Sequence, residues 1–301
     1  MIDFTRKIGF EEFAWGQVNT DLYGVATNTY QLALQVVLEA LGSRTLDIVA
    51  IMPVTASPEA LAAVLRSGAL PCLLDINPFN LQLDVAILKE AVSKCENCVV
   101  ITSGDNVSSS IRDFLVEQDI IEICDTRHTI NPFVATEPKA TFEIYDLAPL
   151  IGAGGFIVSK YQDIMDDIKM VRSGILGHAG HLSPKVSAFM QERAYIHDLY
   201  VQNRKNYEQD HGMRLITDFR YPLLITESTD RVIAHLHSYG VSATRGCIPL
   251  HKIDSIKDRW EATPSYPVAE ELFGKVTALP VGYRMTHSEI KNILLACKEL
   301  R

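Results

Sequence analysis

The sequence predicts an α/β fold with a mostly parallel sheet, and two observations carry that prediction. From about residue 22 to residue 160, short apolar runs of strand length alternate with segments of helical length. The apolar runs are continuous, which is typical of strands covered by helices on both faces. Interleaved helices imply right-handed crossovers between parallel strands, and therefore this fold class.

The predicted elements of this first part follow one another in a regular order. The expected strands are Tyr23–Ala26, Asp47–Met52, Leu70–Asp75, Cys98–Thr102 and Ile120–Asp125. The expected helices are Thr29–Leu41, Pro58–Arg66, Asp84–Lys94 and Ser109–Glu117. Each helix lies between two strands, as a chain of crossovers requires.

The character of the sequence changes near Ser183, where the residues from Pro184 to Glu208 predict one long helix rich in Tyr, Arg and Gln. A shorter α/β unit follows it. Its expected strands are Tyr221–Thr226, Val241–Arg245 and Val276–Leu279, and its expected helices are Asp230–Tyr239, Val268–Lys275 and Ser288–Lys298. We therefore predict a large domain over residues 1–210 and a small C-terminal α/β domain over residues 211–301.

Composition and charge exclude several classes of partner. The formal net charge of −9 argues against a nucleic acid or an anionic membrane, because both need a basic surface. The first residues lack the apolar core of a signal peptide, and no stretch approaches the roughly 18 apolar residues of a membrane span. The sequence thus predicts a cytoplasmic protein with no nucleic-acid partner and no membrane partner.

Most of the six cysteines lie in apolar, strand-like contexts, which predicts buried, reduced thiols. Cys95 and Cys98 form a C-x-x-C sequence between a predicted helix end and a predicted strand. A redox pair or a zinc site is the alternative interpretation, but no second pair accompanies the first. We favour simple burial for these two thiols. The six are Cys72, Cys95, Cys98, Cys124, Cys247 and Cys297.

The segment 141–155, TFEIYDLAPLIGAGG, resembles the S-F-x-x-x-K-x-x-x-x-x-G-x-G-G signature of the nucleotide-sugar aminotransferases. These enzymes form the DegT/StrS group of fold type I pyridoxal phosphate (PLP) enzymes. Thr141 falls on the Ser of the signature and is, by that match, a candidate for binding the cofactor. Gly154 and Gly155 fall on the last two glycines of the signature. Asp146 falls on the lysine that holds PLP as a Schiff base. A carboxylate cannot form that bond, so no covalently bound PLP is expected.

The resemblance covers nearly the whole chain, because further family segments recur in the right order. They are residues 65–76, the P-L-H of residues 249–251, and residues 267–270 and 276–281. The resemblance implies a fold type I, PLP-transferase-like three-layer domain followed by the smaller domain. It also implies a homodimer, since the sites of such enzymes form at a dimer interface.

Thr27, Asn28 and Thr29 open the first helix at the place where the family has S-G-T. A helix N-terminus with free N–H groups binds phosphate well, so these three residues are candidates for the phosphate end of PLP or pyridoxamine phosphate. The alternative is that Thr27 or Asn28 simply caps the helix.

Asp125 ends an apolar strand, where ligands of α/β sheets bind. By the resemblance it falls on the Asp of an E-D-A-A-Q motif, which pairs with the pyridinium nitrogen of the cofactor. His128 falls on the Gln of that motif. The alternative for Asp125 is that it caps the next turn.

Other parts of the family pattern are missing. Residues 53–57, PVTAS, carry no aromatic side chain where the family supplies one to stack on the ring, and residues 179–183, AGHLS, lack the Asn and Arg of N-Y-R-L-S. Each loss weakens cofactor binding by about 1 kcal/mol or more. Lys139 and Lys160 flank strands and are interpreted as solvated charges. PLP binding is therefore expected to be weak.

Three functional interpretations remain open. The favoured one is a degenerate family member that does not transaminate and that binds a nucleotide sugar or serves as partner subunit of an active homologue, in polysaccharide or deoxysugar biosynthesis. The second is an enzyme like the pyridoxamine-phosphate-dependent sugar dehydratases, with Asp146 or His128 as the base. The third is a zinc or manganese site. Its candidate ligands are Asp125, His128, Asp146, His178 and His181.

Overall fold

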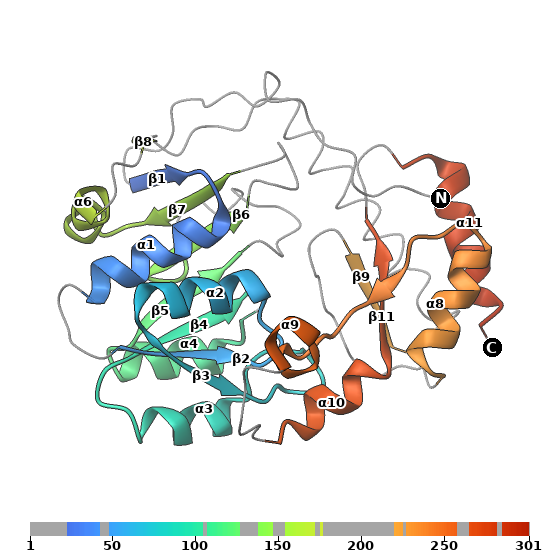
Figure 1. Ribbon diagram of the computed structural model, residues 1–301, viewed down its shortest axis with the longest axis horizontal. Helices are drawn as coiled ribbons and strands as arrows, with labels where there is room; N and C mark the ends of the chain where they lie inside the picture. Colours follow the sequence, from blue (N-terminus) through green and yellow to red (C-terminus); the bar gives the residue numbers. More distant parts are fainter. Residues whose placement is uncertain are drawn as a thin grey trace.

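Two β-sheets organise the chain in the computed structural model (Figure 1). The larger sheet, with its helices, lies on one side, and the smaller sheet lies beside it with the C-terminal helices. The structure describes residues 23–42, 48–104, 107–126, 138–146, 154–171, 175–176, 220–224, 227–257, 265–281 and 285–300.

The larger sheet has eight strands in the order β3-β2-β4-β5-β6-β7-β1-β8. From β3 to β6 every neighbouring pair is parallel, whereas β7 is antiparallel to both β6 and β1. The α/β class and the mostly parallel sheet are thus confirmed. The strands are β1 (Tyr23–Thr27), β2 (Val49–Pro53), β3 (Leu70–Leu74), β4 (Cys98–Ser103), β5 (Ile121–Asp125), β6 (Phe142–Asp146), β7 (Gly155–Ser159) and β8 (Ile175–Leu176).

Helices cover both faces of this sheet, which explains why its strands are apolar throughout. Val100 and Ile101 are neighbours on β4, yet they belong to separate buried clusters on opposite faces. The Ile101 cluster includes side chains of α1 (Tyr30–Gly42), α2 (Pro58–Ser67) and α6 (Gln162–Val171). The Val100 cluster includes side chains of α3 (Val85–Val92) and α4 (Ser109–Glu117).

The smaller sheet is antiparallel, with the order β10-β11-β9. Its core joins Leu223 and Leu279 of the sheet to Leu236 and Ile293 of two helices. The expected strand over residues 241–245 is shorter than predicted, while the predicted boundary near residue 210 and the long helix over residues 184–208 lie outside the described residues. The elements are β9 (Arg220–Leu224), α8 (Thr229–Ser238), β10 (Thr244–Arg245), β11 (Val276–Pro280) and α11 (His287–Lys298).

Three short helices lie between β10 and β11 in the chain and pack against residues of the large sheet. They are η3 (Leu250–Lys252), α9 (Asp254–Lys257) and α10 (Pro267–Phe273). The Leu250 amide donates to the Val54 carbonyl at 2.8 Å, at the end of β2. The buried Asp75 carboxylate, at the end of β3, accepts the amides that open α10. The segments that match the family around residues 65–76, 249–251 and 267–270 therefore meet at this junction.

The six cysteines are all free thiols, but only three are buried. Cys124, Cys247 and Cys297 lie in the core, as the sequence predicts. Cys72, Cys95 and Cys98 are only partly buried, so the burial expected for the C-x-x-C pair is wrong. Each of these three stands near the amino-terminal edge of the sheet or on its outermost strand, where less of the protein covers it.

No helix in the described part of the chain is long and apolar enough to span a bilayer.

Candidate functional site

Polar residues gather at one edge of the large sheet, where several strands end. β4, β5 and β6 are parallel, and β1 runs the same way because β6 and β1 are both antiparallel to β7. Their carboxyl ends therefore share an edge, which we call the carboxyl edge. Thr27, Ser103, Asp125 and Asp146 are the last residues of these strands.

The strand register places Asp146 in one row with the start of the first helix. Asp146 of β6 is opposite Gly155 of β7, and Gly155 is opposite Thr27 of β1. With strands spaced about 4.8 Å apart, the Cα atoms of Asp146 and Thr27 are roughly 10 Å from each other. Asp125 is opposite Ile144, two residues before Asp146. The structure thus brings Thr27, Asp125 and Asp146 to the same edge.

Thr27 and Thr29 hold the turn between β1 and α1 through their own hydroxyl groups. The Thr27 hydroxyl donates to the Thr29 carbonyl at 2.8 Å, and the Thr29 hydroxyl oxygen accepts the Leu32 amide at 3.1 Å. Thr29 is therefore the N-cap of α1, in place of the expected Thr27 or Asn28. Asn28 is exposed. The cap satisfies an amide that an open helix N-terminus would offer to a phosphate.

Gly154 and Gly155, at the start of β7, stand where a side chain would not fit. Gly154 has a φ of 108°, a backbone conformation that residues with a side chain rarely adopt. A Cβ atom on Gly155 would lie 2.5 Å from the Thr29 carbonyl oxygen. The N-terminus of α1 therefore packs directly on the start of β7. This explains why the paired glycines of the family signature recur here without its lysine.

Asp125 lies at the end of β5 with only 3% of its surface exposed. Its backbone carbonyl accepts the Gly104 amide at 2.8 Å, and the next residue, Thr126, donates its hydroxyl to the Ile144 carbonyl at 2.8 Å. These bonds fix the backbone on both sides of the carboxylate. A buried carboxylate at this place suits the pairing with a protonated ring nitrogen that the resemblance implies.

The residues that the structure describes at the carboxyl edge do not fit a covalently bound PLP. Asp146 is a partly buried carboxylate and has no amine with which to form an imine. Lys139 precedes β6 and Lys160 follows the antiparallel β7, so both lie at the opposite edge of the sheet, and both are exposed. The Lys160 ammonium group sits 5.5 Å from the Tyr161 ring centre. Neither lysine substitutes for the missing one.

The loop after β2 offers no aromatic face for a ring to stack on. Val54 and Ala56 are buried, and the Ser57 hydroxyl oxygen accepts the Ala60 amide at 2.9 Å as the N-cap of α2. The Val54 carbonyl is occupied by the Leu250 amide. The loop therefore serves to cap a helix and to hold the connecting segment.

Thr141 does not join the other candidates. It precedes β6, whereas Asp146 ends that strand, so the two residues are five positions, or about 16 Å, apart along the strand. Its hydroxyl oxygen accepts the Glu122 amide at 3.3 Å, and its carbonyl accepts the Ser159 hydroxyl at 2.8 Å. This position conflicts with the expected role of Thr141 in binding a cofactor beside Thr27.

The histidine candidates lie outside the described residues. These are His128, proposed as a base, and His178 and His181, proposed as metal ligands. Within the described ranges, no group of three His, Cys, Asp or Glu side chains is placed to hold a metal ion.

Sequence reasoning did not select Ser103, which the structure places beside Asp125. Ser103 ends β4, and its register partner on β5 is Asp125. The same signal that selected Asp125, a polar residue directly after an apolar run, also applies to Ser103. Gly104 follows it with a φ of 75°, which turns the chain at the carboxyl edge.

Comparisons with known proteins give a family and a fold. The profile of the DegT/DnrJ/EryC1/StrS aminotransferase family matches residues 10–106 and 181–298, more than half of the chain. The matched segments stop on either side of residues 107–180, which contain β5 and β6. No curated protein sequence matches the chain.

Three of the similar solved structures illustrate the likeness. PseC of Helicobacter pylori, an aminotransferase involved in the biosynthesis of pseudoaminic acid, has a TM-score of 0.76 at 16% identity, over 92% of this chain and 86% of that one. The putative sugar aminotransferase Spr1654 of Streptococcus pneumoniae, in its PMP form, has a TM-score of 0.76 at 17% identity, over 92% and 85%. NtdA of Bacillus subtilis with bound PMP has a TM-score of 0.75 at 18% identity, over 92% and 73%. At these identities the likeness establishes the fold of PLP-dependent sugar aminotransferases.

Proposed function

Because this chain belongs to the DegT/DnrJ/EryC1/StrS aminotransferase family, we propose that it keeps the family fold but no longer transaminates. In this proposal the protein binds a nucleotide sugar at the carboxyl edge of the large sheet. It does so alone or as the partner subunit of an active homologue, in the biosynthesis of a deoxysugar or a polysaccharide.

The observation that carries the proposal is the position of Asp146. It ends β6 in one row with Gly155 and Thr27, at the edge where the family binds its cofactor. Transamination needs a lysine amine that holds PLP and moves a proton between two carbon atoms. A carboxylate offers no amine for the bond. Loss of the lysine therefore removes the covalent step of the reaction.

Two further features support a wider loss of the cofactor site. The loop after β2 contributes no aromatic ring, since Val54, Ala56 and Ser57 are buried in packing and capping. The Thr29 hydroxyl oxygen at the start of α1 is bonded to the Leu32 amide. Asp146 is thus one of several departures in the same place.

The wider organisation of the protein is part of the proposal. We place the large domain at residues 1–210 and the small domain at residues 211–301. The core of the small sheet supports this division, because its side chains all come from residue 221 or later. We expect a homodimer, or a heteromer with an active homologue, in the cytoplasm. The acidic net charge of −9 supports the absence of a nucleic-acid partner.

A spectroscopic experiment tests the loss of PLP chemistry. The protein is purified with excess PLP, its visible spectrum is recorded, and it is then treated with borohydride, which turns an imine into a stable adduct that mass spectrometry detects. We expect neither a PLP imine band nor a pyridoxyl adduct. A band in the unaltered protein, with an adduct mapped to a lysine, would overturn the proposal.

The Asp146→Lys variant separates two explanations for such a result. If the site is lost more widely, as we propose, the variant folds but still forms no imine. If this single change restores the band and the adduct, only the lysine has been lost and the remaining site is intact. Circular dichroism of the variant shows whether it is folded.

A binding experiment tests the second half of the proposal. Isothermal titration with UDP-glucose, as a nucleotide-sugar probe, is compared with titration by dTDP-glucose, by UDP and by glucose. We expect one of the nucleotide sugars to bind more tightly than UDP or glucose alone. The two samples are this chain alone and its mixture with an active homologue. If no nucleotide sugar binds at millimolar concentration in either sample, the proposed nucleotide-sugar binding is wrong.

The buried Asp125 favours a second candidate function, a reaction that uses pyridoxamine phosphate without a covalent bond. A buried carboxylate at the end of β5 would pair with a protonated ring nitrogen whether or not a lysine is present. Binding of pyridoxamine phosphate that is lost in Asp125→Asn would favour this candidate. Absence of binding at millimolar pyridoxamine phosphate would exclude it.

A further inference from the structure

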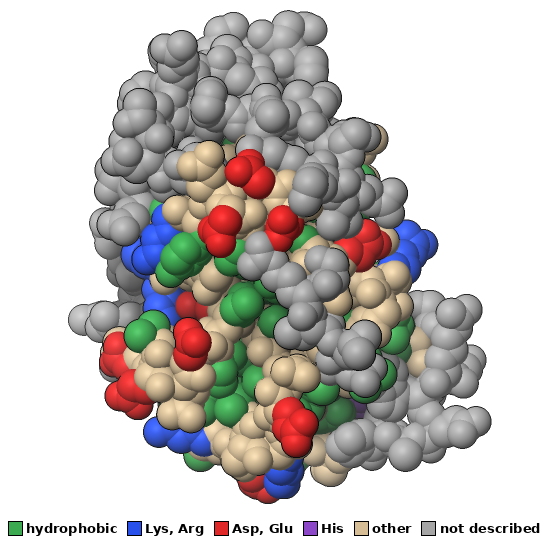
Figure 2. Space-filling view, turned by 90° about the vertical axis from the view of Figure 1, so that its left-hand side faces the viewer, with side chains coloured by type: hydrophobic (Ala, Val, Ile, Leu, Met, Phe, Trp, Pro, Cys, Tyr) green, Lys and Arg blue, Asp and Glu red, His purple; other side chains and the backbone are tan. Residues whose placement is uncertain are grey.

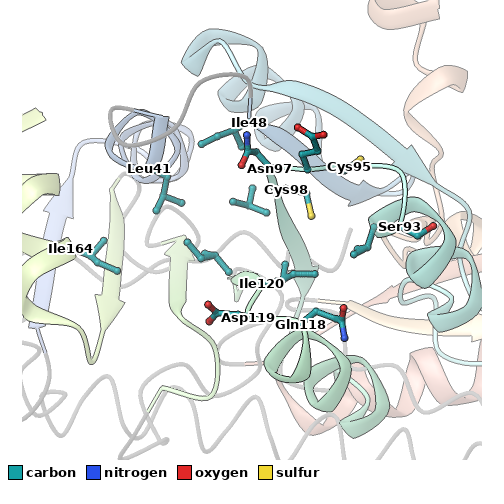
Figure 3. A pocket seen from close by; sticks show the side chains of 14 residues that line it. Leu41, Ile48, Ser93, Cys95, Asn97, Cys98, Gln118, Asp119, Ile120 and Ile164 are labelled. Carbon is teal, nitrogen blue, oxygen red and sulfur yellow. The ribbon is translucent and has the colours of Figure 1, made fainter.

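A cavity of about 470 Å³ lies at the amino-terminal edge of the large sheet, where β4 and β5 begin, and therefore opposite the carboxyl edge. Its volume is in the range of small-molecule sites. The face that contains this edge shows hydrophobic side chains at its centre, with charged side chains around them (Figure 2). Leu41, Ile48 and Ile164 form apolar parts of the lining (Figure 3).

Cys95 and Cys98 line the same cavity (Figure 3). The Cys95 amide donates to the Val92 carbonyl at 3.0 Å, which ties it to the end of α3. Cys98 is the first residue of β4 and is opposite Val49 of β2. Between them, the Asn97 carbonyl accepts the Val49 amide at 2.9 Å. The C-x-x-C sequence is therefore a short bend that is held at both ends and is reached from the cavity.

A third partly buried thiol, Cys72, lies on the neighbouring strand β3. Cys72 is opposite Ile51 of β2, two residues from Val49, so Cys72 and Cys98 share the face of the sheet that α3 covers. Unlike Cys95, Cys72 is fixed in the middle of a strand. It does not line the cavity.

The three thiols influence one another electrostatically. Burial and the nearby Cys95 raise the pKa of Cys98, and the same two causes raise the pKa of Cys72. Both groups are therefore protonated at neutral pH and are poor nucleophiles by themselves. Cys95 lies in the bend after α3, outside the sheet, whereas Cys98 is held in β4 beside β2, so we assign the first attack on an oxidant to Cys95 and the second to Cys98.

We propose that Cys95 and Cys98 are a redox-active pair that forms an intrachain disulfide, with the cavity at the amino-terminal edge as the entrance for a small disulfide such as oxidised glutathione. The sulfur of Cys95, as the thiolate, attacks one sulfur of oxidised glutathione and displaces one glutathione thiolate. That thiolate takes the proton of Cys98. The Cys98 sulfur then attacks the Cys95 sulfur and displaces the second glutathione as a thiolate, which takes up a proton equivalent to the one that Cys95 released to solvent. Two protein thiols are oxidised to one disulfide, and one oxidised glutathione is reduced to two glutathione thiols.

Tryptic digestion distinguishes this disulfide from the alternatives, because of where the lysines and arginines lie. Cleavage after Lys94 and Arg112 places Cys95 and Cys98 in one peptide, residues 95–112, with no other cysteine. Cys72 lies in a separate peptide, residues 67–89. An intrapeptide disulfide lowers the mass of peptide 95–112 by two hydrogen atoms, about 2 Da. A bond to Cys72 instead joins the two peptides.

The experiment incubates the native full chain with mixtures of oxidised and reduced glutathione, quenches with a thiol-blocking reagent and digests without reductant. We expect peptide 95–112 to become lighter and unblocked as the share of oxidised glutathione rises, and to return with dithiothreitol. Cys95→Ser and Cys98→Ser should abolish this change. Cys72→Ser should keep it, and so should Cys297→Ser, which removes a buried thiol elsewhere.

Two results would overturn the proposal. One is peptide 95–112 remaining fully blocked at every glutathione ratio in folded protein. The other is oxidation that joins residues 67–89 to residues 95–112, which would make Cys72 the partner. Circular dichroism of each variant confirms that it is folded. The test does not involve the carboxyl edge, so its outcome is independent of the proposed function.

Discussion

The carboxylate of Asp75 accepts the backbone amide of Ala269 at 3.0 Å, although 194 positions of sequence separate them. Its other oxygen accepts the amide of Val268, also at 3.0 Å. The buried side chain at the end of β3 thus satisfies the first amides of α10, and an acidic group near a helix N-terminus is electrostatically favourable. A single carboxylate therefore joins the large sheet to the C-terminal part of the chain.

Asp75→Ala should lower the free energy of unfolding by about 1.5–3 kcal/mol, because buried amides lose charged acceptors. Asp75→Asn should cost less, since one oxygen remains. Urea denaturation measures both. The matched control is Asp84→Ala, which removes a carboxylate that caps the exposed start of α3 and should cost only about 1 kcal/mol. Equal losses at Asp75 and Asp84 would contradict the special importance of the junction.

Gly155→Ala should destabilise the protein by about 1–3 kcal/mol, because the new Cβ atom would lie 2.5 Å from the Thr29 carbonyl oxygen. The control is Gly274→Ala, where the nearest atom to a Cβ is 3.6 Å away and φ is negative. Thermal unfolding compares the two. If Gly155→Ala unfolds like the original protein, the close packing of α1 on β7 described above is incorrect.

Ser57→Ala should cost about 1 kcal/mol of stability, because α2 loses the hydroxyl that accepts the Ala60 amide. Ser108→Ala is the matched control, since Ser108 precedes α4 without a side-chain capping bond. Its expected cost is smaller. Chemical denaturation of both variants at the same pH makes the comparison, and the reverse order would show that Ser57 does not act as a cap.

Glu122 should make stability depend on pH. Burial raises the pKa of its carboxyl group above the usual 4.5, although the hydrogen bond from Thr102 and the charge of Arg112 oppose the shift. As pH rises, the unfolded chain therefore releases this proton before the folded one does. The stability contributed by the neutral carboxyl is present below the unfolded pKa and is lost as pH rises through the folded pKa.

Glu122→Gln should remove this loss, so its free energy of unfolding should fall less than that of the original protein as pH rises from about 4.5. The amide still accepts the Thr102 hydroxyl. Glu122→Ala should lose about 1–3 kcal/mol, because Thr102 and Arg112 lose their buried partner. Urea denaturation over a pH series measures all three proteins, and an equally steep fall in the Gln variant would contradict the raised pKa.

The elements of the large sheet could be predicted because strands that are buried on both faces appear in the sequence as continuous apolar runs. The run from Cys98 to Thr102 became β4, and Ser109–Glu117 became α4 with the same bounds. Strand order and direction could not be predicted, because they depend on partners far away in the chain. Nothing local to Tyr23–Thr27 indicates that it pairs with β7 and β8 rather than with β2.

The candidate site was predicted in part, for a related reason. Asp125 could be selected because it ends an apolar run, and parallel strands bring such ends to one edge. Asp146 was selected by its match to the lysine of the family signature. Thr141 was selected by its match to a signature, but a sequence match does not show at which end of a strand a residue lies. The register of β6 with β5 and β7 shows that Thr141 precedes β6, at the end opposite Asp146.

The place of β1 in the sheet has a consequence for how the protein is made. Among the strands that the structure describes, β1 is synthesised first, whereas its partners β7 and β8 are encoded much later. The strands from β2 to β5 can pair with one another as they emerge, whereas β1 remains unpaired until β7 has been synthesised. A ribosome that stalls before β7 would therefore hold a nascent chain with an exposed apolar strand, which is the kind of segment that chaperones bind.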